Sequence, residues 1–280
     1  MTAIEMALAG RISPEIALAR MVLGGATVAE IETELAACAG EPAAAGMLAL
    51  VTRYRGSLER LAGVFEGTGL DHAEAGGAEL IARVAGAYDV AVARSPEASV
   101  AAYSLGDAAT LARATAELVG WLEGAGVLPA GADVLDVGCG IGRVAAAMLP
   151  RARSVLGLDV SAGMVAEARR RYPDRRLRFE VTHGRDLAGV AAGEFDVVLA
   201  SDCFPYLVQA GLAGGHVAGA ARALRAGGAL VVLNLSYRGD AAADLADATR
   251  WAREAGMVLE RAGETPFALW DASAWVFRRR

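Results

Sequence analysis

The feature that most constrains the fold is a change of pattern near residue 130. From there on, short aliphatic runs alternate with amphipathic segments of helical period. The runs are DVLDV, SVLGLDV, LRFEV, FDVVLA, ALVVLNL, MVLERAG and SAWVFRR. Aliphatic strands that alternate with amphipathic helices are typical of a parallel sheet covered by helices on both faces. The second part of the chain is therefore predicted to be an α/β domain.

The part of the chain before residue 130 shows only helical patterns. Ser13 followed by Pro14 predicts the start of one helix, and Thr27 with Glu30 forms a capping box for the next. Further helix starts are expected at Pro42, at residue 78 and after Asp107. We therefore divide the chain into a helical region, residues 1–95, and an α/β domain, residues 96–280.

Composition excludes several classes of function. The net charge of −6 argues against a nucleic-acid partner, because neutralising phosphates needs a basic surface. No apolar run reaches the roughly 18 residues of a membrane span, and the amino terminus lacks a signal-peptide pattern. Three widely spaced cysteines give neither a disulfide framework nor a metal site, so we expect a cytoplasmic protein without a metal. The chain has no lysine, which excludes Schiff-base chemistry and the P-loop lysine.

The first strand of the alternating part ends in the turn GCGIGR. Gly138 and Gly140 allow a tight backbone turn and close approach of a ligand. A dinucleotide fingerprint would need a small residue at position 143, where this chain has Arg143. Asp136 adds a carboxylate at the strand tip, which would repel a pyrophosphate but attract an ammonium or sulfonium group.

A second acid, Asp159, ends the next strand in LGLDVS. A carboxylate at this place can accept hydrogen bonds from both hydroxyls of a ribose. The expected ligand therefore carries a ribose and a positive charge but no pyrophosphate, and S-adenosylmethionine (SAM) fits. An α/β turn that binds no ligand is the alternative for GCGIGR alone.

These motifs resemble those of the class I SAM-dependent methyltransferases, over the chain from Tyr103 to the carboxyl terminus. VLDVGCGIGR resembles their first motif, LGLDVSAGMVAEAR the second, GRDLAGVAAGEFDVVLASDCFPYL the next two and ALRAGGALVVLNL the strand that follows. The resemblance implies a seven-stranded, mostly parallel Rossmann-like methyltransferase sheet with helices on both faces. It also implies SAM as methyl donor and S-adenosylhomocysteine as product.

The resemblance assigns roles to single residues of the donor site. The methionine part of SAM is expected on the backbone of Gly138, Cys139 and Gly140 and beside Ser201, with its ammonium on Asp136. Asp159 would take the ribose hydroxyls. The adenine would lie against Val160 and Met164, with its amino edge at Asp186 and Leu187, and Tyr103 would close over the methionine carboxylate.

Three of these assignments have open alternatives. The family usually has Gly-Asp in its third motif, whereas GRDL places Asp186 one position later. Met164 fits a helix core as well as an adenine contact, and the two roles are compatible. Tyr103 fits a buried core position with a satisfied hydroxyl.

The acceptor side is expected in SDCFPY, after the fourth strand. Methyl transfer depends mainly on orientation, and a base is needed only when the acceptor arrives protonated. Asp202 would orient or deprotonate the acceptor, and Tyr206 and Phe204 would line the pocket around it. The segment has some similarity to the Asn/Asp-Pro-Pro-Tyr element of amine and amide methyltransferases. A helix cap is the alternative role of Asp202, and Tyr237 is expected at the rim of the site.

The predicted function is SAM-dependent methylation of a small metabolite on oxygen or nitrogen, with carbon acceptors left open. The helical region would cap the acceptor pocket or form a homodimer surface. One alternative is a SAM-binding protein without methyl transfer, either a regulator or a non-methylating catalyst. Another is a helical interaction module with a vestigial α/β domain.

Overall fold

The computed structural model describes residues 2–38, 40–68 and 77–280. The contacts within the chain divide it into two compact units. The helical unit contains residues 1–69, 90–117 and 267–271, and the sheet unit contains residues 70–89, 118–266 and 272–280. The division therefore crosses the chain five times, whereas the sequence predicts a single boundary after residue 95.

The helical unit begins with four helices, and three of them start at the expected sequence signals. Ser13 caps one helix that starts with Pro14, and the capping box of Thr27 and Glu30 is formed at the next. A six-residue helix before them was not predicted, although its own capping box, Thr2 with Glu5, is present. The helices are α1 (Ala3–Leu8), α2 (Pro14–Leu23), α3 (Val28–Ala37) and α4 (Pro42–Gly63).

Two further helices run across the division between the units. They are α5 (Gly77–Arg94) and α6 (Ala108–Gly124), with a short 3₁₀ turn, Ala102–Ser104, between them. Asp107 accepts a hydrogen bond from the backbone N–H of Thr110 at 2.7 Å, which confirms it as the cap of α6. Helix α5 starts at Gly77, one residue before the start expected at residue 78.

The core of the helical unit is aliphatic, and an aromatic stack belongs to the same unit. Fully buried core side chains come from α2, α3 and α4 and include Leu18, Ile31, Met47, Leu58 and Leu61. The Tyr103 ring stacks on Trp270 with centroids 5.2 Å apart, and Trp270 stacks on Phe267 at 5.6 Å. The carboxylate of Glu117 accepts hydrogen bonds from the backbone N–H groups of residues 268 and 269, so it fixes this loop.

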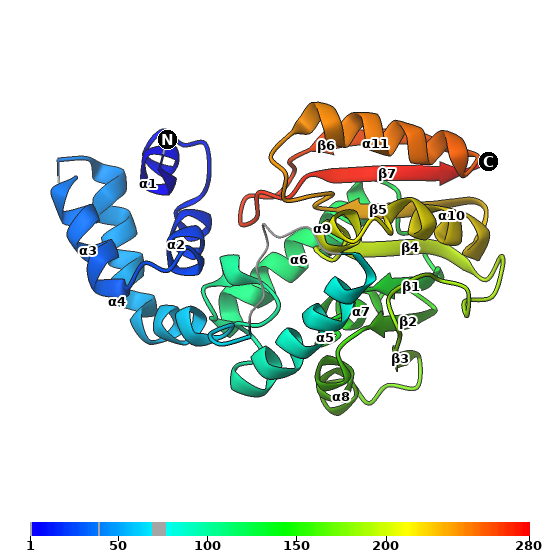
Figure 1. Ribbon diagram of the computed structural model, residues 1–280, viewed down its shortest axis with the longest axis horizontal. Coiled ribbons are helices and arrows are strands. Elements are labelled where there is room, and N and C mark those ends of the chain that lie inside the picture. The colour runs from blue at the N-terminus through cyan, green and yellow to red at the C-terminus, as the bar shows by residue number, and fades with distance from the viewer. Residues whose placement is uncertain (1, 39, 69–76) are drawn as a thin grey trace. The chain divides into compact units, whose positions relative to one another are not determined.

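The sheet unit contains a seven-stranded sheet in the order β3-β2-β1-β4-β5-β7-β6, which confirms the predicted α/β class and strand number (Figure 1). The first five strands of that order pair in parallel, and β7 runs antiparallel to both of its neighbours. The strands are β1 (Asp133–Val137), β2 (Ser154–Asp159), β3 (Leu177–Val181), β4 (Phe195–Ser201), β5 (Leu224–Leu233), β6 (Met257–Glu264) and β7 (Ala274–Arg279).

Five helices follow the strands of this unit. They are α7 (Arg143–Met148), α8 (Ala162–Arg171), α9 (Phe204–Gln209), α10 (Ala213–Ala223) and α11 (Ala241–Glu254). One sheet face packs with α10 and α11 around residues such as Leu135, Val198 and Phe277. Phe179 of β3 points to the other face, because side chains alternate along a strand, and lies against the start of α7 and against α8. The sheet is thus covered by helices on both faces, as predicted.

Two local features differ from the sequence prediction. The helix expected to extend through ARALRAGG ends at Ala223, and β5 starts at the next residue. Gly228 explains this early start, because a Cβ there would lie 2.9 Å from the backbone carbonyl oxygen of Asp196. The close approach of the two strands at this irregular pairing therefore requires glycine. Helix α9 was not predicted, since its six residues are too few for a periodic pattern.

The topology places the candidate site. Strand order reverses between β1 and β4, and the carboxyl ends of parallel strands lie on one edge of the sheet. The tips of β1, β2 and β4, with the residues expected to bind the donor and acceptor, therefore meet at that edge. Among the helices drawn for the described residues, none is long and apolar enough to cross a membrane.

Candidate functional site

The turn after β1 is tight and packed on two sides. Gly138, Gly140 and Gly142 all have left-handed backbone angles, with φ of 71°, 52° and 77°. A Cβ on Gly138 would lie 2.5 Å from the Cβ of Cys203. A Cβ on Gly142 would lie 2.7 Å from the ring of Phe179. Only glycine therefore fits at the first and third positions of this turn.

The backbone N–H groups of the turn are bonded within the protein. Those of Gly138 and Cys139 donate to the carbonyl oxygen of Leu158, at 2.7 and 3.0 Å. The N–H of Gly140 donates to Oδ2 of Asp159 at 2.8 Å. The turn is thereby tied to the tip of β2, and a ligand would meet it through its Cα atoms and carbonyl groups.

Asp136 is the most unusual group of the site. Its side chain is buried, and its Oδ2 atom has no hydrogen-bond partner among the described residues. Burial raises the pKa of this carboxyl group from 3.8 to about 7; nearby Arg143 opposes the rise and Asp159 adds to it. A buried carboxylate oxygen without a donor is unfavourable by about 1–3 kcal/mol or more. It is a binding position that suits a cationic ligand group.

Asp159 sits at the end of β2 and organises the residues around it. Besides the bond from Gly140, its Oδ1 accepts from the backbone N–H of Ser161 at 2.9 Å. Burial raises the pKa of its carboxyl group, and the bonds from the backbone of Ser161 and Gly140 oppose that rise. Each carboxylate oxygen can accept a second hydrogen bond, so these contacts are compatible with binding a diol.

Sequence reasoning missed an acidic residue beside Asp159. Oδ1 of Asp89, on α5, accepts from Oγ of Ser161 at 2.6 Å and from the N–H of Gly163 at 2.8 Å. It therefore caps α8 from a helix more than 70 residues away in the sequence. No sequence signal could have found this pair, because the partner lies on a distant element.

The residues expected around the adenine take different environments. Val160 is partly buried, and its side chain contacts the backbone position of Gly184, where Ile81 of α5 also packs. Met164 is 1% exposed in α8, which agrees with its alternative as a core residue. Leu187 is also buried and lies against Gly219 of α10.

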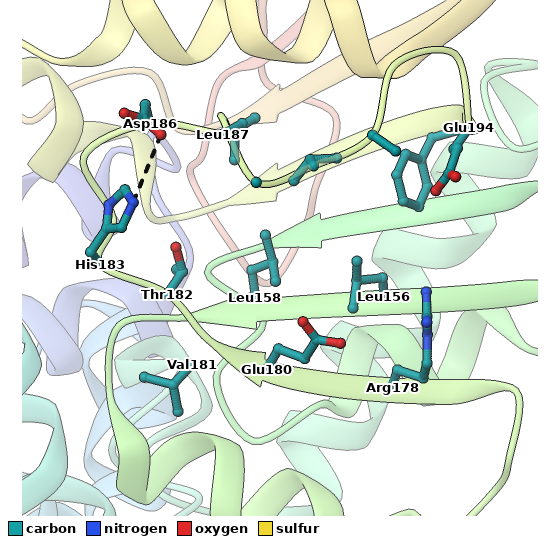
Figure 2. Close-up of a pocket in the computed structure, with 14 residues that line it drawn as sticks. Leu156, Leu158, Arg178, Glu180, Val181, Thr182, His183, Asp186, Leu187 and Glu194 are labelled. Atoms are coloured by element: carbon teal, nitrogen blue, oxygen red, sulfur yellow. Dashed lines mark ion pairs between the residues drawn. The ribbon is translucent and has the colours of Figure 1, made fainter.

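Asp186 lies at one end of a groove along β2 and β3. The groove has a volume of about 400 Å³ and is lined by Leu156, Leu158, Arg178, Glu180 and ten residues between Val181 and Phe195 (Figure 2). Asp186 pairs with His183 at 3.8 Å, and its Oδ1 accepts from the N–H of Ala188 at 2.8 Å. Both side chains of the ion pair are more than half exposed. Asp186 thus bonds to residues of its own loop, and it lies with His183 at the end of the groove (Figure 2).

The tip of β4 carries the residues expected on the acceptor side. Ser201, its last residue, pairs in register with Leu233 of β5 and is half-buried. Asp202 follows with φ of 62°, and its Oδ1 accepts from Nδ2 of Asn234 at 2.7 Å and from the hydroxyl of Tyr237 at 3.3 Å. Cys203 is the N-cap residue of α9, which has no side-chain cap bond, so Asp202 is not the helix cap.

Tyr206 lies in α9 beside two other tyrosines. Its hydroxyl is 3.0 Å from that of Tyr88 on α5, and its ring meets the rings of Tyr88 and Tyr237 edge to face. Asn234 and Tyr88 were missed as site residues. Asn234 gave a weak signal, since it is a polar residue directly after an aliphatic strand.

Two residues expected in the donor site, Tyr103 and Cys139, belong to different units. Tyr103 belongs to the helical unit, where it stacks on Trp270, whereas the other expected donor residues belong to the sheet unit. Cys139 is buried with its sulfur atom toward Gly157 of β2. Burial raises the pKa of its thiol well above the usual range, and the nearby carboxylates of Asp159 and Asp136 add to the rise.

Burial and three carboxylates raise the pKa of one thiol group, that of Cys203, at the strand tips. Burial raises the pKa of the Cys203 thiol, and so does the negative charge of Asp136, Asp159 and Asp202. These acids therefore lie near one another at the carboxyl edge of the sheet. Over the described part of the chain, no group of three His, Cys, Asp or Glu side chains could hold a metal ion. The edge is suited to an organic cation.

Comparison with known proteins places this edge in a recognised domain. Residues 134–228 match a family described as methyltransferase domain. Over 77 residues the chain is 36% identical to the magnesium-protoporphyrin O-methyltransferase of Rhodobacter capsulatus, covering 27% of this chain and 34% of that protein. It is 36% identical over 101 residues to the ubiquinone biosynthesis O-methyltransferase of Thiobacillus denitrificans, covering 35% and 42%.

The chain is also similar to a protein whose name describes a different reaction. The chain is 29% identical over 140 residues to a SAM-dependent Diels-Alderase of Talaromyces variabilis, covering 48% of this chain and 46% of that protein. The chain thus spans less than half the length of the curated relatives it matches. Among solved structures, magnesium protoporphyrin IX methyltransferase of Synechocystis with bound SAM matches with 20% identity and a TM-score of 0.46, covering 60% of this chain and 79% of that one.

Proposed function

We propose that this chain, whose residues 134–228 match a family described as methyltransferase domain, transfers a methyl group from SAM to an oxygen or nitrogen atom of a small metabolite. The observation that carries the proposal is the buried Oδ2 of Asp136 without a hydrogen-bond partner beside the glycine turn. SAM supplies an activated methyl group on a sulfonium, which is a good leaving group. The residues of the chain then have to bind the donor and to orient the acceptor.

Asp136 would hold the ammonium group of the donor. A cation at its Oδ2 would supply the missing hydrogen-bond donor and favour the ionised carboxylate, which burial disfavours. The glycine turn, Gly138, Cys139 and Gly140, would then contact the methionine chain, with Ser201 beside it. Because all of these positions follow β1 or end β4, they share one edge of the sheet.

Asp159 would receive the ribose hydroxyls through its remaining lone pairs. Its orientation is fixed by the N–H groups of Gly140 and Ser161, so little side-chain freedom would be lost on binding. Val160 and Met164 are proposed on the adenine side, with Asp186 and Leu187 at the amino edge. Tyr103 is proposed as a contact of the methionine carboxylate.

Asp202 and Tyr206 are proposed on the acceptor side. Asp202 adjoins Cys203, which lies against Gly138, so it is one residue from a side chain that packs on the glycine turn. A carboxylate at this place can orient a hydroxyl or amino group and take its proton. Two relatives that carry O-methyltransferase in their names support an oxygen acceptor.

Donor binding and turnover test this function. We expect calorimetry to measure SAM binding, and Asp136→Ala and Asp159→Ala to weaken it at least tenfold. Asp174→Asn is the matched control, because Asp174 pairs with Arg176 away from the strand tips and should leave affinity unchanged. Incubation with SAM and a metabolite panel should release S-adenosylhomocysteine together with a methylated product. Undiminished affinity in both folded alanine variants would contradict the proposal.

A non-methylating SAM-dependent catalyst is the second candidate. The relative named as a SAM-dependent Diels-Alderase supports it, since that name describes bond formation without methyl transfer. The two candidates differ in the fate of the donor. SAM consumed in proportion to product favours methyl transfer, whereas product formed from unchanged SAM favours the second candidate.

Location and assembly are also proposals. Three cysteines without a disulfide framework support a cytoplasmic protein. For residues 1–95 we propose a role in covering the acceptor or in forming a homodimer. Light scattering after size-exclusion chromatography, with and without residues 1–95, would separate a homodimer role from a monomeric one.

A further inference from the structure

Three tyrosines and one carboxylate form a cluster at the tips of β4 and β5. The cluster consists of Tyr88, Tyr206, Tyr237, Asp202 and Asn234. Its members come from α5, α9, the segment after β5 and the two strand ends. The phenol of Tyr237 and the amide of Asn234 both donate to Oδ1 of Asp202, and the hydroxyls of Tyr88 and Tyr206 lie 3.0 Å apart.

The backbone holds two members of this cluster in an uncommon conformation. Asp202 and Asn234, each directly after a strand, have left-handed φ angles of 62° and 67°. Such angles are unfavourable by about 1 kcal/mol for residues other than glycine, although Asn and Asp tolerate them best. The N–H of Asp202 donates to the carbonyl of Leu233, and that of Asn234 to the carbonyl of Ser273. The two bonds fix the carboxylate and amide against each other.

The hydroxyl groups of the cluster act as donors at any ordinary pH. Burial raises the pKa of all three tyrosines well above 10. The negative charge of Asp202 adds to the rise for each of them. The phenols therefore stay protonated, and Asp202 is surrounded by neutral donors.

This set of groups discriminates between acceptor atoms. An acceptor hydroxyl can donate its proton to Asp202 and at the same time accept a hydrogen bond from a tyrosine or from Asn234. An ammonium group can only donate, so it could bond to Asp202 but could accept no hydrogen bond from a tyrosine or from Asn234. The cluster therefore favours an oxygen over a protonated nitrogen.

The rings and the base favour a phenol over an alkyl alcohol. Aromatic rings prefer edge-to-face or offset contacts with other aromatic rings, and the two ring pairs of the cluster already meet at 85° and 83°. A carboxylate is a weak base, and a phenol with a pKa near 10 loses its proton far more readily than an alkyl alcohol. Tyr237 is 42% exposed, so its side chain is accessible from solvent.

We propose that this cluster is the acceptor site of the methyl transfer and that its acceptor class is a phenol, with Asp202 as the proton acceptor and Tyr237 as a specificity-determining contact. The proposal rests on the proposed function. The phenolic O–H bond breaks and its proton goes to the Asp202 carboxylate. An oxygen electron pair forms the new O–CH₃ bond, and the S–CH₃ pair returns to sulfur. A cation and a carboxylate are thereby converted to a neutral thioether and a carboxylic acid.

Acceptor chemistry is the first test. The whole chain with SAM is offered mono- and bicyclic phenols together with the matching benzylamines and saturated alcohols near neutral pH, and methylated products are identified by mass spectrometry. We expect methyl ethers from phenols alone. Methylation of the benzylamines or alcohols, or of no phenol although SAM binds, would overturn the phenol proposal and leave the proposed donor site intact. Failure to bind SAM would instead refute the proposed function.

Variants test the two named roles. Asp202→Asn should lower kcat at least 100-fold for phenol while S-adenosylhomocysteine binding by calorimetry stays within twofold. The loss should shrink to less than tenfold for para-nitrophenol at an alkaline pH where it is ionised, because no proton then has to be removed. A purely structural role would give the same loss for both acceptors and would overturn the assignment.

Tyr237→Phe keeps the ring and removes the hydroxyl. We expect KM for the phenol to rise about tenfold, with kcat within about threefold, since the lost contact is a hydrogen bond. Tyr54→Phe is the matched control, because its hydroxyl lies in the helical unit near Thr110. An unchanged KM in Tyr237→Phe would refute the specificity role of that residue.

Discussion

Replacing Asp136 by Asn should stabilise the protein while weakening donor binding. The pKa of this carboxyl group rises from 3.8 to about 7 on folding, because burial disfavours the charged form. Each tenfold change in proton affinity is worth about 1.4 kcal/mol, so the rise corresponds to about 4 kcal/mol. Asn keeps the shape of the side chain and removes the charge. The variant should therefore be more stable than the wild type at any pH where this group is ionised in the unfolded chain, above about pH 4.

The pKa difference between the folded and unfolded chain determines whether wild-type stability rises or falls with pH. Below about pH 4 Asp136 is protonated in both the folded and unfolded chain and has no effect. Between about pH 4 and 7 the unfolded chain loses this proton first, so wild-type stability falls as pH rises. Above about pH 7 this loss of stability is complete. The stability advantage of Asp136→Asn should therefore grow by about 2–3 kcal/mol between about pH 5 and pH 8.

Urea denaturation of both proteins without SAM at these two pH values measures the effect. Asp133 is the matched control, since it lies on the same strand and pairs with Arg153 and Arg225. Those partners, Arg153 first, lower the pKa of Asp133, so its stabilisation is present above its ordinary range and is lost as pH falls. Asp133→Asn should destabilise near pH 8. Equal or lower stability of Asp136→Asn at both pH values would refute the reasoning.

Other substitutions probe the donor site, the turn and the helical unit. Asp159→Asn should weaken SAM binding at least tenfold by calorimetry and also lower the melting temperature, because the amide NH2 cannot accept one of the bonds from the N–H groups of Gly140 and Ser161; unchanged affinity would contradict its ribose role. Gly142→Ala should destabilise by about 2–4 kcal/mol, because its φ is 77° and a Cβ would meet the ring of Phe179; Gly86→Ala, in the open interior of α5, should instead stabilise by about 0.5–1 kcal/mol in the same melts. Trp270→Ala should cost about 3 kcal/mol by removing the central ring of the aromatic stack, and a loss below about 1 kcal/mol would show that the stack contributes little.

The sequence by itself determined the class of the fold and the donor edge of the sheet. Alternating strands and helices specify a parallel sheet, because each apolar strand needs cover on both faces. The positions of Asp136 and Asp159 at strand ends then follow, since parallel strands bring their carboxyl ends to one edge. Local signals such as the Thr27 capping box also fixed helix starts, because a cap depends only on residues three positions apart.

Only the tertiary structure decided which distant side chains complete these sites. Asp89 reaches α8, and Tyr88 beside it reaches Tyr206, because α5 brings both residues to the strand tips across more than 70 positions of sequence. The unpartnered oxygen of Asp136 and the bond from Asn234 to Asp202 are likewise invisible in a pattern. Burial and partner choice depend on the summed packing of several elements, whereas periodicity and caps are local properties of one.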